Sequence, residues 1–400
     1  MESLKIKEFL IIKNSQFDIG RVNIIIGVQA NGKSLLVKLL YLFREVINDI
    51  FVISIQNREI KKEFIKRIIS SFVKYFPKYT WVGKNIDIIY VYNDIEIKIY
   101  KSPTQKMVKV EFSKFFTTQF SFLKREYGKF LRKDDFISNN FGLFKEECLK
   151  SSEFYPYFNN SIFIPASRTF FANLQKNIFS FLAESIDIDP FMKEFGSKYE
   201  IAKRTHSDTK FKPNEKFNNI LEKILKGKYR YFEKQDWIES KEGIINLANA
   251  SSGQQESLPM LLILSVFSFI NPNEKKTYFI EEPEAHLFPI SQKHIVELIG
   301  LVYNGLQDIV ITTHSPYILT ALNNLLLGYD IKIKKGEKAI KEMIDSDFCV
   351  NFDDVKAYTI ENGELKSILD SEARLIGTNI IDSVSDEFSE VFDSLLSLED

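Results

Sequence analysis

Short apolar runs alternate with amphipathic stretches along most of this chain. Four continuous apolar runs are typical of strands buried in a parallel sheet: 22–26, 162–164, 277–280 and 308–312. Three stretches near them have the spacing of amphipathic or buried helices: 33–48, 255–270 and 290–303. Buried strands that alternate with helices predict the α/β fold class, with a parallel sheet at the centre.

Period-two patterns predict two hairpins, one at 86–100 with a turn at Asn93–Asp94 and one at 355–369 with a turn at Asn362–Gly363. The same reading adds strands at 4–12 and 107–112, helical regions at 58–76, 113–150, 174–228 and 378–398, and a hairpin-like segment at 229–250. We therefore expect a discontinuous head domain (1–50 and 160–400), an inserted α+β subdomain (51–159) and, within the head, a mainly helical lid (174–240).

Composition and charge limit the classes of protein to which this chain can belong. The chain has 400 residues, 44% of them hydrophobic, and 53 basic against 54 acidic residues, so no global field attracts it to nucleic acid or membranes. Cys148 and Cys349 have neither metal-ligand nor redox spacing. The first residues lack a signal-peptide core, and the longest apolar run is too short to span a bilayer. These features predict a soluble cytoplasmic protein with no membrane partner.

Residues 27–34 read Gly-Val-Gln-Ala-Asn-Gly-Lys-Ser and match the pattern GxxxxGK[ST] between a predicted strand and a predicted helix. Glycines allow consecutive backbone N–H groups to surround phosphate oxygens, and the helix N-terminus adds its dipole. In such a loop, Lys33 neutralises β- and γ-phosphate charge and Ser34 can ligate Mg²⁺. The motif in this context predicts nucleotide binding.

Two further apolar strands end in side chains suited to phosphate chemistry. Strand 277–280 is followed by Glu281 and Glu282, of which the first can hold Mg²⁺ through water and the second can polarise the attacking water. Strand 308–312 leads to His314, which can reach a γ-phosphate. The alternatives are a solvated acidic strand end and a histidine in a capped loop, and the neighbouring P-loop favours the catalytic interpretation.

A small polar stretch, Ser251–Gln255, precedes the buried helix at 255–270. Its simplest interpretation is a helix cap, with Ser251 or Ser252 at the N-cap and Glu256 in the first turn. The same helix end, with Gly253, is also an anion site. Because the P-loop already provides one phosphate cradle, we expect the second to serve the nucleotide of another subunit.

In order and spacing, these motifs resemble the ABC-type ATPase head, and more narrowly the branch of SMC-like proteins and OLD-family ATPases. Five segments carry the resemblance: GVQANGKS (Walker A), SSGQQ (the place of the LSGGQ signature), FIEEPEAHLFP (Walker B and D-loop), ITTHSP (H-loop) and FIPASR (a strand end near the Q-loop position). The resemblance implies a P-loop NTPase with an inserted α+β and helical lid region, which forms a head-to-tail homodimer around ATP.

The resemblance also implies roles for individual residues. They are ATP binding by Gly27, Asn31, Gly32, Lys33, Ser34 and Leu35, Mg²⁺ binding by Ser34 and Glu281, catalysis by Glu282 as base with Lys33 and the switch residue His314, and contacts of Ser252, Gly253 and Gln255 to the partner's γ-phosphate. Gln254 replaces the second glycine of LSGGQ, and Glu281 replaces the more common aspartate. Arg168 is a candidate for sensing or dimer contact, with a surface salt bridge as its alternative.

With an intact ATP site and no effector domain expected in the same chain, this subunit resembles those of antiphage systems, especially the Septu ATPase, which pairs with a separate HNH nuclease. The first hypothesis is therefore a defence ATPase that assembles with a nuclease effector and gates it. The second is an SMC-like ATPase in DNA repair or recombination, in which the basic, aromatic segment Lys61–Lys78 follows DNA phosphates. For that segment, a solvated helix packed on the head is the alternative. A third hypothesis is an ATP-dependent scaffold.

Overall fold

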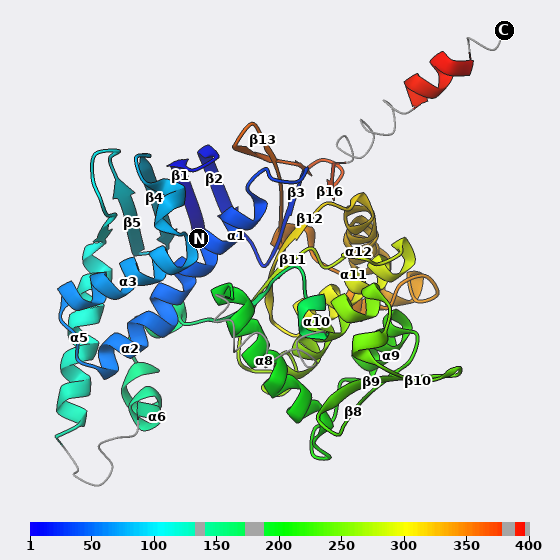
Figure 1. Ribbon diagram of the computed structural model, residues 1–400, viewed down its shortest axis with the longest axis horizontal. Helices are drawn as coiled ribbons and strands as arrows, with labels where there is room; N and C mark the ends of the chain where they lie inside the picture. Colours follow the sequence, from blue (N-terminus) through cyan, green and yellow to red (C-terminus); the bar gives the residue numbers. More distant parts are fainter. Residues whose placement is uncertain (133–140, 173–187, 378–388, 397–400) are drawn as a thin grey trace.

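A computed structural model describes residues 1–132, 141–172, 188–377 and 389–396 (Figure 1). Its central sheet has six strands in the order β14-β13-β3-β12-β11-β7. Their bounds are β3 Val22–Ile26, β7 Asn160–Ile164, β11 Lys276–Glu281, β12 Asp308–Thr313, β13 Val355–Glu361 and β14 Glu364–Ser367. All neighbours pair in parallel except β14, which is antiparallel to β13. The predicted α/β class is confirmed.

Alternate residues of the central strands face two separate cores. Ile24 belongs to the core under α10 (Ser252–Phe267), α11 (Pro289–Asn304) and α12 (Pro316–Lys335). Its neighbour Ile25 belongs to the other core, which includes α1 (Lys33–Glu45) and a second sheet. Because both faces are covered, the central strands are continuous apolar runs, as parallel strands usually are.

The second sheet is antiparallel, with the order β2-β1-β4-β5-β6. Its strands are β1 Glu2–Phe9, β2 Ile12–Ile19, β4 Ile86–Tyr92, β5 Ile95–Lys101 and β6 Lys109–Phe112. Five helices lie between or after these strands in the sequence: α2 (Phe51–Gln56), α3 (Lys61–Tyr75), α4 (Lys78–Trp81), α5 (Lys114–Phe130) and α6 (Phe141–Phe144). The sheet thus joins the N-terminal hairpin to strands from residues 86–112.

The single strand expected at 4–12 is instead the start of a hairpin. The chain turns at Leu10, whose φ is 54°, and Ile11, which is 48% exposed. A turn made of two apolar residues leaves no polar break in the pattern, so the sequence did not reveal it. The other two predicted hairpins are confirmed, with positive φ at Asn93, Asn362 and Gly363.

The segment predicted as a lid contains α8 (Pro190–Ser207), α9 (Glu215–Leu225) and the strands β8 (Lys228–Phe232) and β9 (Gln235–Ser240), which form a small antiparallel sheet with β10 (Gly243–Asn246). A short pair, β15 (Leu369–Asp370) and β16 (Leu375–Ile376), follows β14. Parts of three predicted helical regions, 133–140, 173–187 and 378–388, lie outside the described residues, as do 397–400. Residues 389–396 are helical and exposed, and extend away from the body (Figure 1).

Candidate functional site

The P-loop joins β3 to α1 and has the backbone that its glycines predict. Gly32 has a φ of 94°, a left-handed conformation that favours glycine, and a Cβ there would lie 3.2 Å from the side chain of Ile11. The Asn31 side chain donates to the carbonyl oxygen of Ile360 at 3.2 Å, which fastens the loop to β13. Ser34 is exposed at the start of α1, where the helix dipole favours an anion.

Lys33 lies over its own loop. Its Nζ donates to the carbonyl oxygens of Gly27 and Val28, both at 2.7 Å, and lies 3.2 Å from Nδ1 of His314. Burial lowers the pKa of Lys33, while the nearby carboxylates of Glu282 and Glu284 act in the opposite direction. The ammonium is therefore held beside two carboxylates at the end of the sheet.

His314 connects this lysine to the predicted base. Its Nε2 is 2.9 Å from Oε1 of Glu282, so Lys33, His314 and Glu282 form one chain of polar contacts. The three residues follow the adjacent strands β3, β12 and β11, whose carboxyl ends meet at one edge of the sheet. Glu282 has a φ of 44°, which is uncommon for a residue other than glycine.

Glu284 was not singled out from the sequence. Its Oε1 accepts hydrogen bonds from the Thr313 hydroxyl and from the backbone N–H of His314, both at 2.7 Å. It therefore positions the loop that carries the histidine. The only signal in the sequence was its place in the FIEEPEAHLFP segment, two residues after Glu282.

Glu281 has the properties of a metal-binding carboxylate. It is buried, its Oε2 accepts from the N–H of Ala166 at 3.3 Å, and its Oε1 has no hydrogen-bond partner. A buried carboxylate oxygen without a partner is costly unless a cation occupies the position. Among the described residues, no cluster of three or more His, Cys, Asp or Glu side chains could hold a metal unaided. The free oxygen of Glu281 suits Mg²⁺, which is usually bound through one or two carboxylates together with phosphate and water.

Arg168 is completely buried, so the surface salt bridge considered for it is wrong. Its guanidinium donates to the carbonyl oxygens of Pro165 (2.9 Å), Glu281 (2.7 Å) and Glu282 (3.0 Å). It also donates to the carbonyl of Glu256 at 2.9 Å and pairs with that residue's carboxylate at 3.3 Å. Burial lowers the pKa of Arg168, whereas the nearby glutamate carboxylates, with that of Glu256 first, raise it. Arg168 therefore links α10 to the end of β11.

The start of α10 is capped by Ser251, one of the two expected residues, but not with Glu256 as its partner. Ser251 is the N-cap, and Gln254, rather than Glu256, completes the capping box. The Gln254 side chain also donates to the Leu225 carbonyl at 2.7 Å, and that of Gln255 donates to Leu247 at 3.1 Å. Glu256 is instead the buried partner of Arg168. The predicted start at 255 is thus three residues too late.

Two residues of this stretch, Ser252 and Gly253, differ in their surroundings. Ser252 is exposed, and Gly253 lies so close to the 283–288 loop that a Cβ would come within 2.8 Å of the His286 carbonyl oxygen. Within the described ranges, no hydrogen bond or ion pair joins Ser251–Gln255 to Gly27–Ser34. The structure thus brings together Lys33, Glu281, Glu282 and His314, and leaves Ser252 apart from them.

The fold and the site define a P-loop NTPase of the ABC-ATPase head type: a parallel sheet with a GxxxxGKS loop after one strand and paired carboxylates after another. The family model described as AAA ATPase domain matches residues 1–319, and the chain belongs to that family. A search of curated proteins gave no match.

Solved structures similar to this chain include SMC head domains. The head domain from Thermotoga maritima is 11% identical, with a TM-score of 0.40, over 92% of this chain and 97% of that one. The Pyrococcus furiosus Smc head domain with an extended coiled coil, bound to the C-terminal domain of ScpA, is 12% identical, with a TM-score of 0.38, over 97% of this chain and 100% of that one.

No helix in the described ranges is long and apolar enough to cross a membrane.

Proposed function

We propose that this chain binds ATP with Mg²⁺ and hydrolyses it at the edge formed by β3, β12 and β11. The observation that carries the proposal is the continuous contact from Lys33 through His314 to Glu282, directly beside the P-loop. Glu282 would take a proton from the attacking water, while the β–γ bridging P–O bond breaks and ADP and phosphate leave. Ser34 and Glu281 would hold Mg²⁺, and the loop residues Gly27, Asn31, Gly32, Lys33 and Leu35 would hold the phosphates.

We further propose that two copies complete the site, head to tail. The start of α10, with exposed Ser252 and with Gly253, would provide an anion site, and no hydrogen bond or ion pair among the described residues joins it to the chain's own P-loop. Large apolar side chains beside the motifs are exposed to solvent, which is typical of an interaction surface: Val28, Phe288, Ile290 and Tyr317. In the assembled pair, Ser252, Gly253 and Gln255 would contact the γ-phosphate of the partner's ATP.

The test is Glu282→Gln, which keeps the shape of the side chain and removes its basicity. We expect ATP binding to persist, hydrolysis to fall by about 10²-fold or more, and ATP-dependent dimers to accumulate, as measured by phosphate release and light scattering. Lys33→Ala is the matched control, because it should lose nucleotide binding and dimers together. Hydrolysis by Glu282→Gln within twofold of the unchanged chain would remove Glu282 from the mechanism.

The biological role that we propose is antiphage defence, in which this ATPase assembles with a separate nuclease subunit, such as an HNH protein, and gates it in the cytoplasm. The support for this role is the resemblance to ATPase subunits of the Septu type, in which the nuclease is a separate protein. Expression with the adjacent gene, followed by phage challenge, tests it. Protection that survives both Lys33→Ala and Glu282→Gln excludes ATP gating.

DNA binding remains a second candidate on the strength of α3. Most aromatic residues of the segment are not available to bases, because Phe64, Phe72, Tyr75 and Phe76 are buried in the core, as the alternative of a helix packed on the head requires. The lysines of the segment, however, are exposed and could follow phosphates: Lys61, Lys62, Lys66, Lys74 and Lys78. DNA affinity of the purified chain that falls steeply with salt, and falls again in Lys62→Glu/Lys66→Glu, would favour an SMC-like role.

A further inference from the structure

The C-terminal helix, residues 389–396, presents an apolar stripe to solvent. Val391, Phe392, Leu395 and Leu396 have the spacing of one helix face and are 48–62% exposed. Figure 1 shows this helix extending from the body, in red. An isolated helix of this length is unstable in water, so its helicity requires a surface on which to pack.

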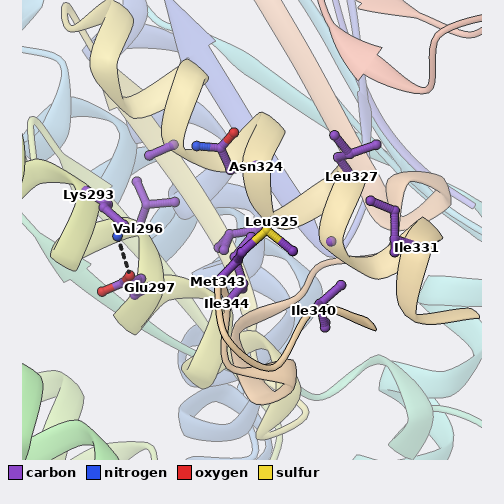
Figure 2. A pocket seen from close by; sticks show the side chains of 12 residues that line it. Lys293, Val296, Glu297, Asn324, Leu325, Leu327, Ile331, Ile340, Met343 and Ile344 are labelled. Carbon is purple, nitrogen blue, oxygen red and sulfur yellow. Dashed lines mark ion pairs between the residues drawn. The ribbon is translucent and has the colours of Figure 1, made fainter. Parts of the chain in front are cut away.

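A pocket of about 300 Å³ lies between α11, α12 and the turn at 340–344 (Figure 2). Leu325 and Ile340, which line it, are buried, while Leu327 and Met343, which also line it, are 50% and 71% exposed. The volume is at the lower end of the ~300–1,000 Å³ range of ligand pockets and suits one or two inserted side chains. An apolar groove between helices is a common receptor for an amphipathic helix.

The segment beside the groove is basic, whereas the helix is acidic; the charged residues that line the groove itself, Lys293 and Glu297, form a pair. Five lysines and two glutamates occur between residues 332 and 342, and Lys293, which pairs with Glu297 at 3.4 Å, lies at one side of the pocket (Figure 2). No lysine or arginine follows Arg374 in the sequence, and the helix itself carries Glu390 and Asp393. Electrostatic complementarity therefore favours this pairing and disfavours a basic partner in the groove.

The chain reaches the groove within its own molecule. Ile376 exchanges two hydrogen bonds with the Asn323 side chain on α12, at 2.8 and 2.9 Å, and Arg374 pairs with Asp330 of the same helix at 2.9 Å. Residues 378–388 are eleven residues, which can span ~40 Å at most. Because α12 lines the pocket, the connection starts beside the groove, and the tether raises the local concentration of the helix.

We propose that helix 389–396 docks into this groove of its own chain, with its apolar stripe against the pocket and its acidic residues toward the lysines. This goes beyond the ATPase activity. The helices α11 and α12 begin directly after the 283–288 loop and after His314–Ser315, respectively. A docked C-terminal helix therefore ties together the two helices that lead away from the candidate site.

The test is cross-linking in the full chain with Cys148→Ser, in which the remaining native cysteine, Cys349, is buried. Asn324→Cys, at the pocket, is combined with Ser389→Cys, which leaves the apolar stripe intact. A short bismaleimide should join them within one chain. The matched control pairs Ser389→Cys with Val82→Cys. Val82 is exposed and lies just before β4, a strand of the antiparallel sheet.

We expect the pocket pair to cross-link at least about tenfold faster than the control pair, and Leu395→Asp to remove most of this difference, since it places a charge in the apolar stripe. High salt should slow the reaction. Equal rates for the two pairs would overturn the proposal. Products that join two chains, identified by mass, would overturn it in favour of a second copy as the occupant. Asn324, Ser389, Val82 and Leu395 are exposed and Cys148 is half-buried, and thermal unfolding checks that each variant is folded.

Discussion

The carboxyl edge of β3, β12 and β11 and the start of α10 are built in opposite ways. At the sheet edge, polar side chains face one another, and Lys33, His314 and Glu282 are in contact within a single chain. At the start of α10, both glutamines turn toward the chain's own backbone and Ser252 faces solvent. The difference teaches that the cluster at the sheet edge is assembled within one chain, whereas the start of α10 would be completed only in the dimer that we propose.

Arg168 joins these two regions, and its replacement should have the largest effect on stability. Arg168→Met leaves Glu256 buried without its cation, so we expect a loss of about 3–5 kcal/mol in the free energy of unfolding, measured with urea. Arg230→Met is the control, because the Arg230–Glu239 pair is exposed and should contribute less than about 1 kcal/mol. Equal losses would show that the buried link does not hold the two regions together.

Ser252→Arg tests whether the start of α10 acts on another copy. We expect ATP binding by the isolated chain to remain, while ATP-dependent dimers are lost and hydrolysis falls by about a hundredfold, because a large cation displaces the second phosphate contact. Ser207→Arg adds the same charge at an exposed site on α8 and should change neither measurement. Unaltered assembly and turnover in Ser252→Arg would mean that the α10 end is only a helix cap.

Glu45 lies at the end of α1 that is far from the P-loop. Its substitution should therefore change the stability of the protein without changing its hydrolysis of ATP. Burial raises the pKa of Glu45 from its ordinary 4.5 to about 7, and Glu194 and Asp49 add to this, against a hydrogen bond from Tyr75. Between these pH values the folded state binds the proton and the unfolded state does not. The contribution of Glu45 to stability therefore falls as pH rises from 4.5 to 7.

Glu45→Gln should remove that pH dependence. We expect the variant to be more stable than the unchanged chain at pH 8, by on the order of 2 kcal/mol, and nearly equal to it at pH 4.5. Urea unfolding at both pH values measures the difference, and hydrolysis per folded chain should be unchanged. A stability difference that is the same at both values would contradict the raised pKa.

The sequence predicted the elements that carry strong local signals. The buried strands, the P-loop with its helix, and the turns at Asn93 and Asn362–Gly363 are where their residues place them. The helix α12 was not among the predicted elements, although it begins with a proline in its first turn, after the Ser315 cap. The pairing of β1 with β4 was also not predicted, because local patterns do not specify which distant strands are neighbours.

At the site, the sequence indicated the residues that motifs define, and the structure brings Lys33, Glu282 and His314 into contact; their catalytic roles stay predictions. The role of Glu284 and the buried contact between Arg168 and Glu256 could not be predicted from the sequence. Their partners are backbone carbonyls and N–H groups that only the folded chain brings together. The sequence alone does not distinguish an arginine that donates to four buried carbonyl oxygens from an arginine on the surface.

The position of β3 has a consequence for how the protein is made. This strand, which leads into the P-loop, takes both of its sheet neighbours, β12 and β13, from the last quarter of the chain. At ribosomal rates of about 5–20 residues per second, roughly 15–60 s pass between synthesis of β3 and of β12. The antiparallel sheet of residues 2–112 has all its strands much earlier. Nucleotide binding is thus a late event in biogenesis, and an interrupted nascent chain exposes a bare P-loop strand to chaperones and to aggregation.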